Sequence, residues 1–259
     1  MSGLHLERVG QGPALVLLHG WAMHGGVFAP LRSALADRFE VITVDLPGHG
    51  GSCGSALPLT LEAVSDALAE ALPPRAVLLG WSLGGLLAMA HALRHPARVR
   101  GLCLIAASPR FVHAPDWPEG MDPRVFEAFG EELARDYRGT LDRFLMLEAQ
   151  GSTPLRDTLR LLRDAVDARG EPDARALREG LALLHDADLR GGLGALSMPS
   201  LWLAGRRDRL VSPAAMREAA GRARDARVQV FEHAGHAPFL TAPGAVADAL
   251  TAFAAECPA

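Results

Sequence analysis

The chain has 259 residues, of which 49% are hydrophobic and 22% charged, and its formal net charge at pH 7 is −4. These proportions are typical of a globular protein, and the negative charge gives no general attraction to nucleic acid or to an anionic membrane. The three cysteines, Cys53, Cys103 and Cys257, form no CxxC pair, so we expect neither a disulfide framework nor a thiolate metal site.

The first residues, MSGLHLERVGQG, contain neither a basic segment nor an apolar one. No apolar run along the chain reaches the ~18 residues that a membrane helix needs. We therefore expect no signal peptide and no membrane span, and a protein located in the cytoplasm.

Short apolar runs predict buried strands in the first and last parts of the chain. They are residues 14–20, 39–46, 76–81, 99–108, 200–205 and 227–234. Runs rich in Val, Ile and Leu without alternation are typical of a parallel sheet that is covered on both faces. Helical stretches lie between them, one capped by Thr60, one from Leu83 to before Pro96, and one opened by Ser212. This alternation predicts an α/β fold with a mostly parallel central sheet and helices on both faces.

Residues 110–188 break the alternation, because they contain no convincing strand. Helix start and stop signals follow one another there instead: Asp122 and Pro123 to Gly139, Thr140 to Gly151, Thr153 and Pro154 to Gly170, and a further helix over 173–184. We expect this segment to be a helical cap (lid), inserted into a core formed by 1–109 and 189–259.

A nucleophile is predicted within LLGWSLGGLLAMA, residues 78–90. Gly80 to Gly84 fit the G-x-S-x-G pattern of a strained strand-to-helix turn that exposes a serine hydroxyl. The pattern alone is weak, but a predicted strand precedes Ser82 and a predicted helix follows it. A catalytic Ser82 is therefore favoured over a structural serine in a tight turn.

A serine nucleophile needs a histidine to accept its proton and a carboxylate to orient that histidine. In this fold the acid and the histidine follow the serine along the chain, each after a strand. Asp208 and His236 occupy these two positions. His233 is the alternative base, and Asp116 is the nearest acid after the preceding strand.

The oxyanion of an acyl-transfer reaction needs two N–H donors. The residue after the nucleophile, Leu83, supplies the first, and Trp21, in the loop after the 14–20 strand, is expected to supply the second. We expect His19 to brace this loop, and Asp45 and His49 to shape the turn that follows the next strand.

Five segments together resemble the α/β-hydrolase superfamily: LVLLHGW, VDLPGHGGS, GWSLGGL, LAGRRDRLVSP and GHAPF. The GWSLGG string, the HGW loop and the final GHAPF are similar to the pimeloyl-[acyl-carrier protein] methyl ester esterase family of biotin synthesis. The resemblance implies a four-helix cap, no metal or cofactor, and hydrolysis of a methyl ester on a carrier-bound pimeloyl chain. Ser82, Asp208 and His236 fall on the family's triad. Trp21, Leu83 and Phe144 fall on its oxyanion and substrate contacts, although Phe144 could also be a plain core residue.

An acidic carrier protein would require arginines on the cap, and residues 138–163 hold five arginines and three acids. The family's cap arginines match Arg143, Arg156 and Arg160; a fourth falls at Gly139, beside Arg138. Arg156, Arg160 and Arg163 share one helix face, next to an apolar stripe of Leu155, Leu159, Leu162 and Val166. The alternative is a solvated face, with Arg160–Asp164 and Arg163–Asp167 as i, i+4 pairs.

Other functions remain open at this point. A broad short-chain esterase, a lactonase, a C–C hydrolase or a menaquinone-route lyase would carry the same triad, whereas a binding module without chemistry would lack a triad member. The expected partner is the acyl-carrier protein that bears the substrate; we expect neither nucleic acid nor a membrane as a partner, and we expect a monomer.

Overall fold

The computed structural model describes residues 3–258. A single sheet of seven strands runs through this part of the chain, in the order β1-β3-β2-β4-β5-β6-β7. The strands are β1 His5–Val9, β2 Ala14–Leu18, β3 Glu40–Asp45, β4 Ala76–Trp81, β5 Val99–Ile105, β6 Ser200–Gly205 and β7 Ala226–Phe231. Each of the six expected strands is present, and β2 to β7 run parallel to one another.

Strand β1 was not expected from the sequence. It pairs antiparallel with β3 at the edge of the sheet, with His5 opposite Asp45 and Val9 opposite Val41. Its side chains are half-buried or exposed, so its sequence lacks the continuous apolar run of the inner strands.

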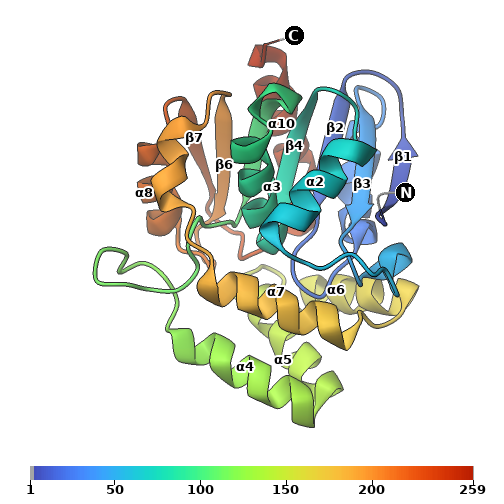
Figure 1. Ribbon diagram of the computed structural model, residues 1–259, viewed down its shortest axis with the longest axis vertical. Coiled ribbons are helices and arrows are strands. Elements are labelled where there is room, and N and C mark those ends of the chain that lie inside the picture. Colours follow the sequence, from blue (N-terminus) through green and yellow to red (C-terminus); the bar gives the residue numbers. More distant parts are fainter. Residues whose placement is uncertain (1–2, 259) are drawn as a thin grey trace.

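Helices cover both faces of the sheet (Figure 1). The core helices are α1 Ala29–Leu35, α2 Leu61–Ala71, α3 Leu83–Arg94, α8 Pro213–Arg222, α9 Pro238–Thr241 and α10 Pro243–Glu256. Four short 3₁₀ helices join them: η1 Gly25–Phe28, η2 Gly50–Ser52, η3 Pro96–Arg98 and η4 Arg190–Ala195. The predicted caps are confirmed, because Thr60 and Ser212 accept hydrogen bonds from the N–H groups of Ala63 and Ala215.

Four further helices follow one another between β5 and β6: α4 Pro123–Arg135, α5 Tyr137–Ala149, α6 Leu155–Arg169 and α7 Ala174–Asp186. We refer to them as the cap helices. Figure 1 shows them gathered at one end of the sheet, beyond the carboxyl ends of the parallel strands. That end is where α/β proteins place their ligand sites.

Two predicted boundaries among the cap helices are wrong. Gly139 and Thr140 do not separate two helices but lie inside α5. The break falls earlier, because the Asp136 side chain accepts a hydrogen bond from Gly139 N and caps α5, while α4 ends at Arg135. The Asp136 side chain stabilises the start of a helix here, so Gly139 does not end one.

Cap helix α6 is fastened to the sheet by charge. Arg169 Nη1 lies 2.9 Å from Oδ2 of the buried Asp45 at the end of β3, and Nη2 contacts Glu7 on β1. Asp45 also accepts hydrogen bonds from the N–H groups of Gly25 and Gly51.

In the range 3–258, no helix is both long and apolar enough to cross a membrane.

Candidate active site

Ser82 occupies a strained turn between β4 and α3. Its φ of 54° and ψ of −117° lie outside the regions that L residues favour, which costs about 1–3 kcal/mol. Its N–H donates to Ile105 O at 3.0 Å, which ties the turn to β5. Such strain is common where a reactive side chain must be held clear of its own backbone.

The flanking glycines are required by close contacts. A Cβ on Gly84 would lie 2.2 Å from Leu18 O, and one on Gly80 would lie 2.3 Å from Gly84 O. Both distances are far below van der Waals contact, so no larger residue fits at either position. The G-x-S-x-G pattern therefore has a packing cause here.

His236 and Asp208 form a buried pair beside the turn. His236 Nδ1 lies 2.9 Å from Asp208 Oδ2. Asp208 Oδ1 accepts the N–H groups of Leu210 and Val211, at 2.8 and 3.1 Å, which fixes the carboxylate. The Trp81 indole N–H donates to His236 O at 2.9 Å and so links the histidine loop to the residue before Ser82.

The hydrogen bond to Asp208 sets the tautomer of His236: Nδ1 carries the proton and donates it, which leaves Nε2 as an acceptor. Nε2 is buried and has no hydrogen-bond partner among the described residues. The side chain is thus arranged to accept a proton from a group that enters the site.

The two alternative triad residues lie elsewhere. His233 is exposed in the turn after β7, which ends at Phe231 rather than at residue 234 as expected. Asp116 is exposed and pairs with Arg190 at 3.0 Å. In this structure it is Asp208 that contacts His236.

The loop after β2 passes directly beside Ser82, since a Cβ on Gly20 would lie 3.4 Å from Ser82 Cβ. This places the backbone of Trp21, the next residue, at the same site. The N–H of Leu83 is one of the first in α3, and such groups have no partner within the helix. Both predicted oxyanion donors therefore belong to segments that border Ser82.

His19 holds this loop in place. Its Nδ1 donates to Gly20 O at 2.8 Å and its Nε2 accepts from Leu46 N at 2.9 Å. Complete burial lowers the pKa of His19 to about 3, so the ring is neutral and can make both hydrogen bonds. Through these two hydrogen bonds His19 braces the loop after β2, as expected.

The predicted substrate contacts meet beneath the cap helices. The rings of Trp21 and Phe144 are 4.5 Å apart, edge to face, and Trp21 Nε1 donates to Leu177 O of α7 at 2.8 Å. Gly180 of α7 packs so closely that a Cβ there would lie 2.7 Å from Trp21 and 3.2 Å from Leu83. These side chains form an apolar wall between the cap and Ser82.

Known esterases resemble this chain over nearly its whole length. Residues 15–249 match the alpha/beta hydrolase family. A pimeloyl-[acyl-carrier protein] methyl ester esterase of Stenotrophomonas maltophilia (strain R551-3) is 55% identical over 252 residues, 97% of this chain and 96% of that protein. Its counterpart in Xanthomonas campestris pv. campestris (strain B100) is 54% identical over 98% of this chain and 100% of its own. The chain belongs to this esterase family.

Solved structures with the same fold include an esterase from Exiguobacterium antarcticum, with a TM-score of 0.86 and 24% identity over 98% of this chain and 96% of its own. An enol-lactonase from Burkholderia xenovorans LB400 has a TM-score of 0.84 and 23% identity, with the same coverage. At these identities the likeness concerns the fold, and it confirms the α/β-hydrolase architecture of this esterase.

The four predicted docking arginines lie on two neighbouring cap helices, Arg138 and Arg143 on α5, and Arg156 and Arg160 on α6. Arg138 pairs with Glu171 at 2.7 Å, Arg143 with Glu132 at 2.8 Å, and Arg160 with Asp157 at 3.9 Å. They remain at the surface, although most of them already contact a carboxylate.

The i, i+4 pairs of the alternative interpretation, a solvated face on α6, are not the ones that form. Arg160 reaches back to Asp157, and Arg163 reaches across to Asp142 of α5 at 3.1 Å. The apolar stripe holds for Leu159, Leu162 and Val166, which are buried, but Leu155 at the start of the helix is exposed. Spacing along one helix predicts only partners on that helix, and so it misses Asp142 on α5.

Glu148 is a buried acid to which the sequence patterns assign no role. Its carboxyl group is fully buried on the inner face of α5, one turn after Phe144, and neither oxygen has a hydrogen-bond partner in residues 3–258. Burial, and then the negative charge of Asp208, raise the pKa of Glu148 well above its ordinary value. No motif marks such a residue, because its environment is created by the cap.

In the described part of the chain, no group of three or more His, Cys, Asp or Glu side chains is arranged to hold a metal ion.

Proposed function

We propose that this esterase hydrolyses the methyl ester of pimeloyl-[acyl-carrier protein], giving the pimeloyl carrier and methanol in biotin synthesis. The observation that carries the chemistry is the His236–Asp208 pair, which leaves a buried Nε2 acceptor beside the strained Ser82 turn. The substrate follows from the names of relatives that share more than half of this chain's residues.

In the first step, Ser82 Oγ attacks the ester carbonyl carbon while His236 Nε2 accepts the hydroxyl proton. Asp208 stabilises the resulting imidazolium through its hydrogen bond to Nδ1. The tetrahedral intermediate collapses when His236 gives the proton to the methoxy oxygen, which leaves as methanol. An acyl-Ser82 ester remains.

In the second step, water attacks the acyl-enzyme and His236 accepts its proton. A second tetrahedral intermediate forms, and the same proton returns to Ser82 Oγ as the acyl bond breaks. The product carries a free carboxylate where the ester had been.

In both intermediates the negative oxygen requires donors that are already in place. We assign these to the N–H groups of Trp21 and Leu83, because both segments border Ser82 and because His19 fixes the loop. Phe144 and the Trp21 ring supply the apolar wall for the acyl chain.

The arginines of α5 and α6, Arg138, Arg143, Arg156 and Arg160, form the proposed contact with the carrier. Guanidinium groups suit carboxylates and phosphates, which an acidic carrier and its phosphopantetheine arm present. We place the reaction in the cytoplasm and the working unit as a monomer, with residues 110–188 as the lid over the site.

Mass spectrometry of pimeloyl-[acyl-carrier protein] methyl ester, incubated with catalytic amounts of the esterase, tests this proposal. We expect the loss of one methyl ester from the carrier and no loss with Ser82→Ala. A free short-chain methyl ester, assayed in parallel, separates the two halves of the proposal. Cleavage of the free ester alone would keep the triad and refute the carrier-bound substrate.

A further inference from the structure

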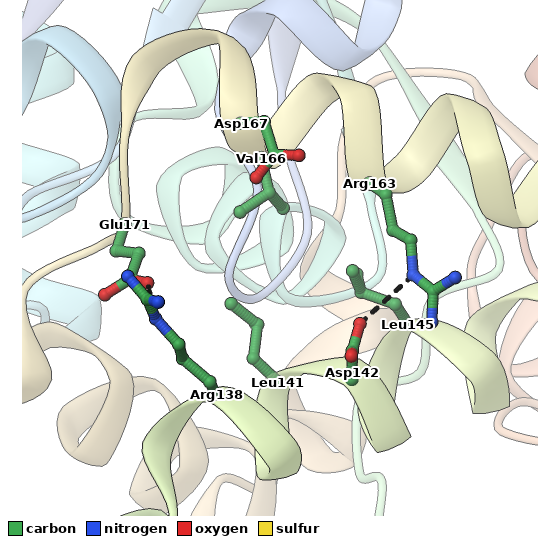
Figure 2. Close-up of a pocket in the computed structure, with 8 residues that line it drawn as sticks. All are labelled: Arg138, Leu141, Asp142, Leu145, Arg163, Val166, Asp167 and Glu171. Carbon is green, nitrogen blue, oxygen red and sulfur yellow. Dashed lines mark hydrogen bonds and ion pairs between the residues drawn. The ribbon is translucent and has the colours of Figure 1, made fainter.

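A groove of about 400 Å³ lies between α5 and α6 (Figure 2). Its floor consists of Leu141 and Leu145 from α5 and Val166 from α6, all of which are buried. Charged side chains form its rim, and Figure 2 shows them extending from α5, from α6 and from the segment just after α6, around the apolar floor. They are Arg138, Asp142, Arg163, Asp167 and Glu171.

Two ion pairs cross this groove from one wall to the other. Arg163 of α6 lies 3.1 Å from Asp142 of α5, and Arg138 of α5 lies 2.7 Å from Glu171, just after α6. All four side chains are well exposed, Arg138 to 85%. Exposed pairs of this kind contribute little to stability, so another anion can replace the carboxylate at little cost.

The groove adjoins both the proposed docking face and the catalytic wall. Arg163 continues the line of Arg156 and Arg160 along α6, at one helical turn from Arg160. Leu141 and Leu145 flank Phe144, which packs on Trp21 beside Ser82. Ser82 and His236 are almost completely buried, so a carrier-bound chain can reach them only if side chains of the cap move.

We propose that Asp142 and Glu171 are built-in competitors for the carboxylates of the acyl-carrier protein. In the free esterase they occupy Arg163 and Arg138 and hold the two walls of the groove together. An acidic carrier that binds along α6 takes over both arginines, and the release of the two pairs frees α5 and α6 to separate above Phe144. This inference rests on the proposed function, because it names the partner that exchanges with Asp142 and Glu171.

The test is a gain of activity that is specific for the carrier. We expect Asp142→Asn and Glu171→Gln each to raise the ratio of kcat/KM for the carrier-bound ester to kcat/KM for a free methyl ester by about two- to fivefold. Arg163→Gln should lower the same ratio. Both effects should shrink at high salt, because exposed charges are screened.

Asp66→Asn is the matched control. Asp66 pairs with Arg94 at 2.7 Å between α2 and α3, with similar exposure, so its loss changes the net charge by the same amount away from the groove. We expect it to leave the ratio unchanged. The double variant Asp142→Asn with Arg163→Gln should show no gain over Arg163→Gln, because the gain requires the liberated arginine.

The outcomes separate the two proposals. Wild-type esterase that leaves carrier-bound ester intact refutes the proposed function and this inference together. Cleavage by the wild type, with equal ratios for Asp142→Asn, Glu171→Gln and Asp66→Asn, refutes the competition alone. A gain from Asp142→Asn that persists without Arg163 refutes it as well, since the effect would then not pass through that arginine.

Discussion

Ser82 keeps a backbone conformation that an isolated L residue would avoid, and its neighbours explain how. Its N–H donates a hydrogen bond to β5. Gly80 and Gly84 let the turn close tightly, because backbone oxygens lie within 2.3 Å of the places where their Cβ atoms would be. The strain is thus balanced by hydrogen bonding and packing on both sides. The glycines and the serine are readable from sequence because this geometry admits few other residues.

Asp208→Asn tests the role of the acid. The N–H groups of Leu210 and Val211 hold the amide oxygen, so the NH2 group faces His236 Nδ1 and donates to it. The imidazole then takes the wrong tautomer and Nε2 no longer accepts from Ser82. We expect kcat for a free methyl ester to fall by about 10⁴-fold with the fold retained. Asp116→Asn, the alternative acid, should keep wild-type activity. A loss of less than tenfold for Asp208→Asn would exclude it as the triad acid.

Glu148→Gln tests a buried acid through its effect on stability. The pKa of Glu148 is raised by burial, so above its ordinary value of 4.5 the folded state holds a proton that the unfolded state releases. Stability therefore falls as pH rises, by up to about 1.4 kcal/mol per pH unit. The glutamine variant lacks this loss, and its advantage should grow from pH 5 to pH 8 in urea unfolding. An advantage that does not vary with pH would show that Glu148 is ionised in the folded state.

At the scale of elements, contacts between distant segments join the cap helices to the core. His24 contacts Ala165 O of α6, Trp21 donates to Leu177 O of α7, and Arg169 joins α6 to Asp45 and Glu7. None of these contacts is visible in the sequence, because each joins segments more than 100 residues apart. Helix ends inside the cap were misplaced for a related reason: Asp136 and Gly139 compete locally, and only the folded chain decides between a cap and a stop.

Arg169→Gln tests the fastening of α6. It leaves the buried Asp45 carboxylate with the N–H groups of Gly25 and Gly51 but without its cation. We expect a loss of about 1–3 kcal/mol in the free energy of unfolding, measured with urea. Arg124→Gln removes an exposed pair with Asp122 at the start of α4 and should change stability much less than Arg169→Gln does. Equal costs for the two variants would mean that the Arg169–Asp45 contact adds nothing to stability.

At the scale of the whole molecule, the inner strands and the positions of the proposed triad residues could be predicted because each has a local signature. Apolar runs identify parallel strands, and Ser82, Asp208 and His236 each follow one of them. The edge strand β1 and the buried Glu148 have no such signature, since β1 is half-exposed and the environment of Glu148 comes from tertiary packing. Sequence patterns indicate structure that is set by neighbouring residues, whereas the surroundings of the candidate site form only when the cap helices pack on the core.

Three buried histidines should dominate the response of the molecule to acid. Burial lowers the pKa of His19 to about 3, and those of His49 and His91 to about 4, from an ordinary value of 6.5. Below pH 6.5 the unfolded chain takes up protons that the folded chain refuses, so stability falls as pH falls toward 4. Each histidine contributes up to about 1.4 kcal/mol per pH unit.

Between pH 4.5 and 6.5 this loss exceeds the opposite effect of the single carboxyl group of Glu148, so net stability should decline from pH 6.5 to pH 5. Urea unfolding at pH 6.5, 5.75 and 5 measures the slope. His91→Gln should reduce it by about one proton, because the ring that accepts no proton in the folded state is gone. A slope that is the same in His91→Gln and the wild type would mean that His91 is protonated in the fold, as it would be if water reached the space between α2 and α3.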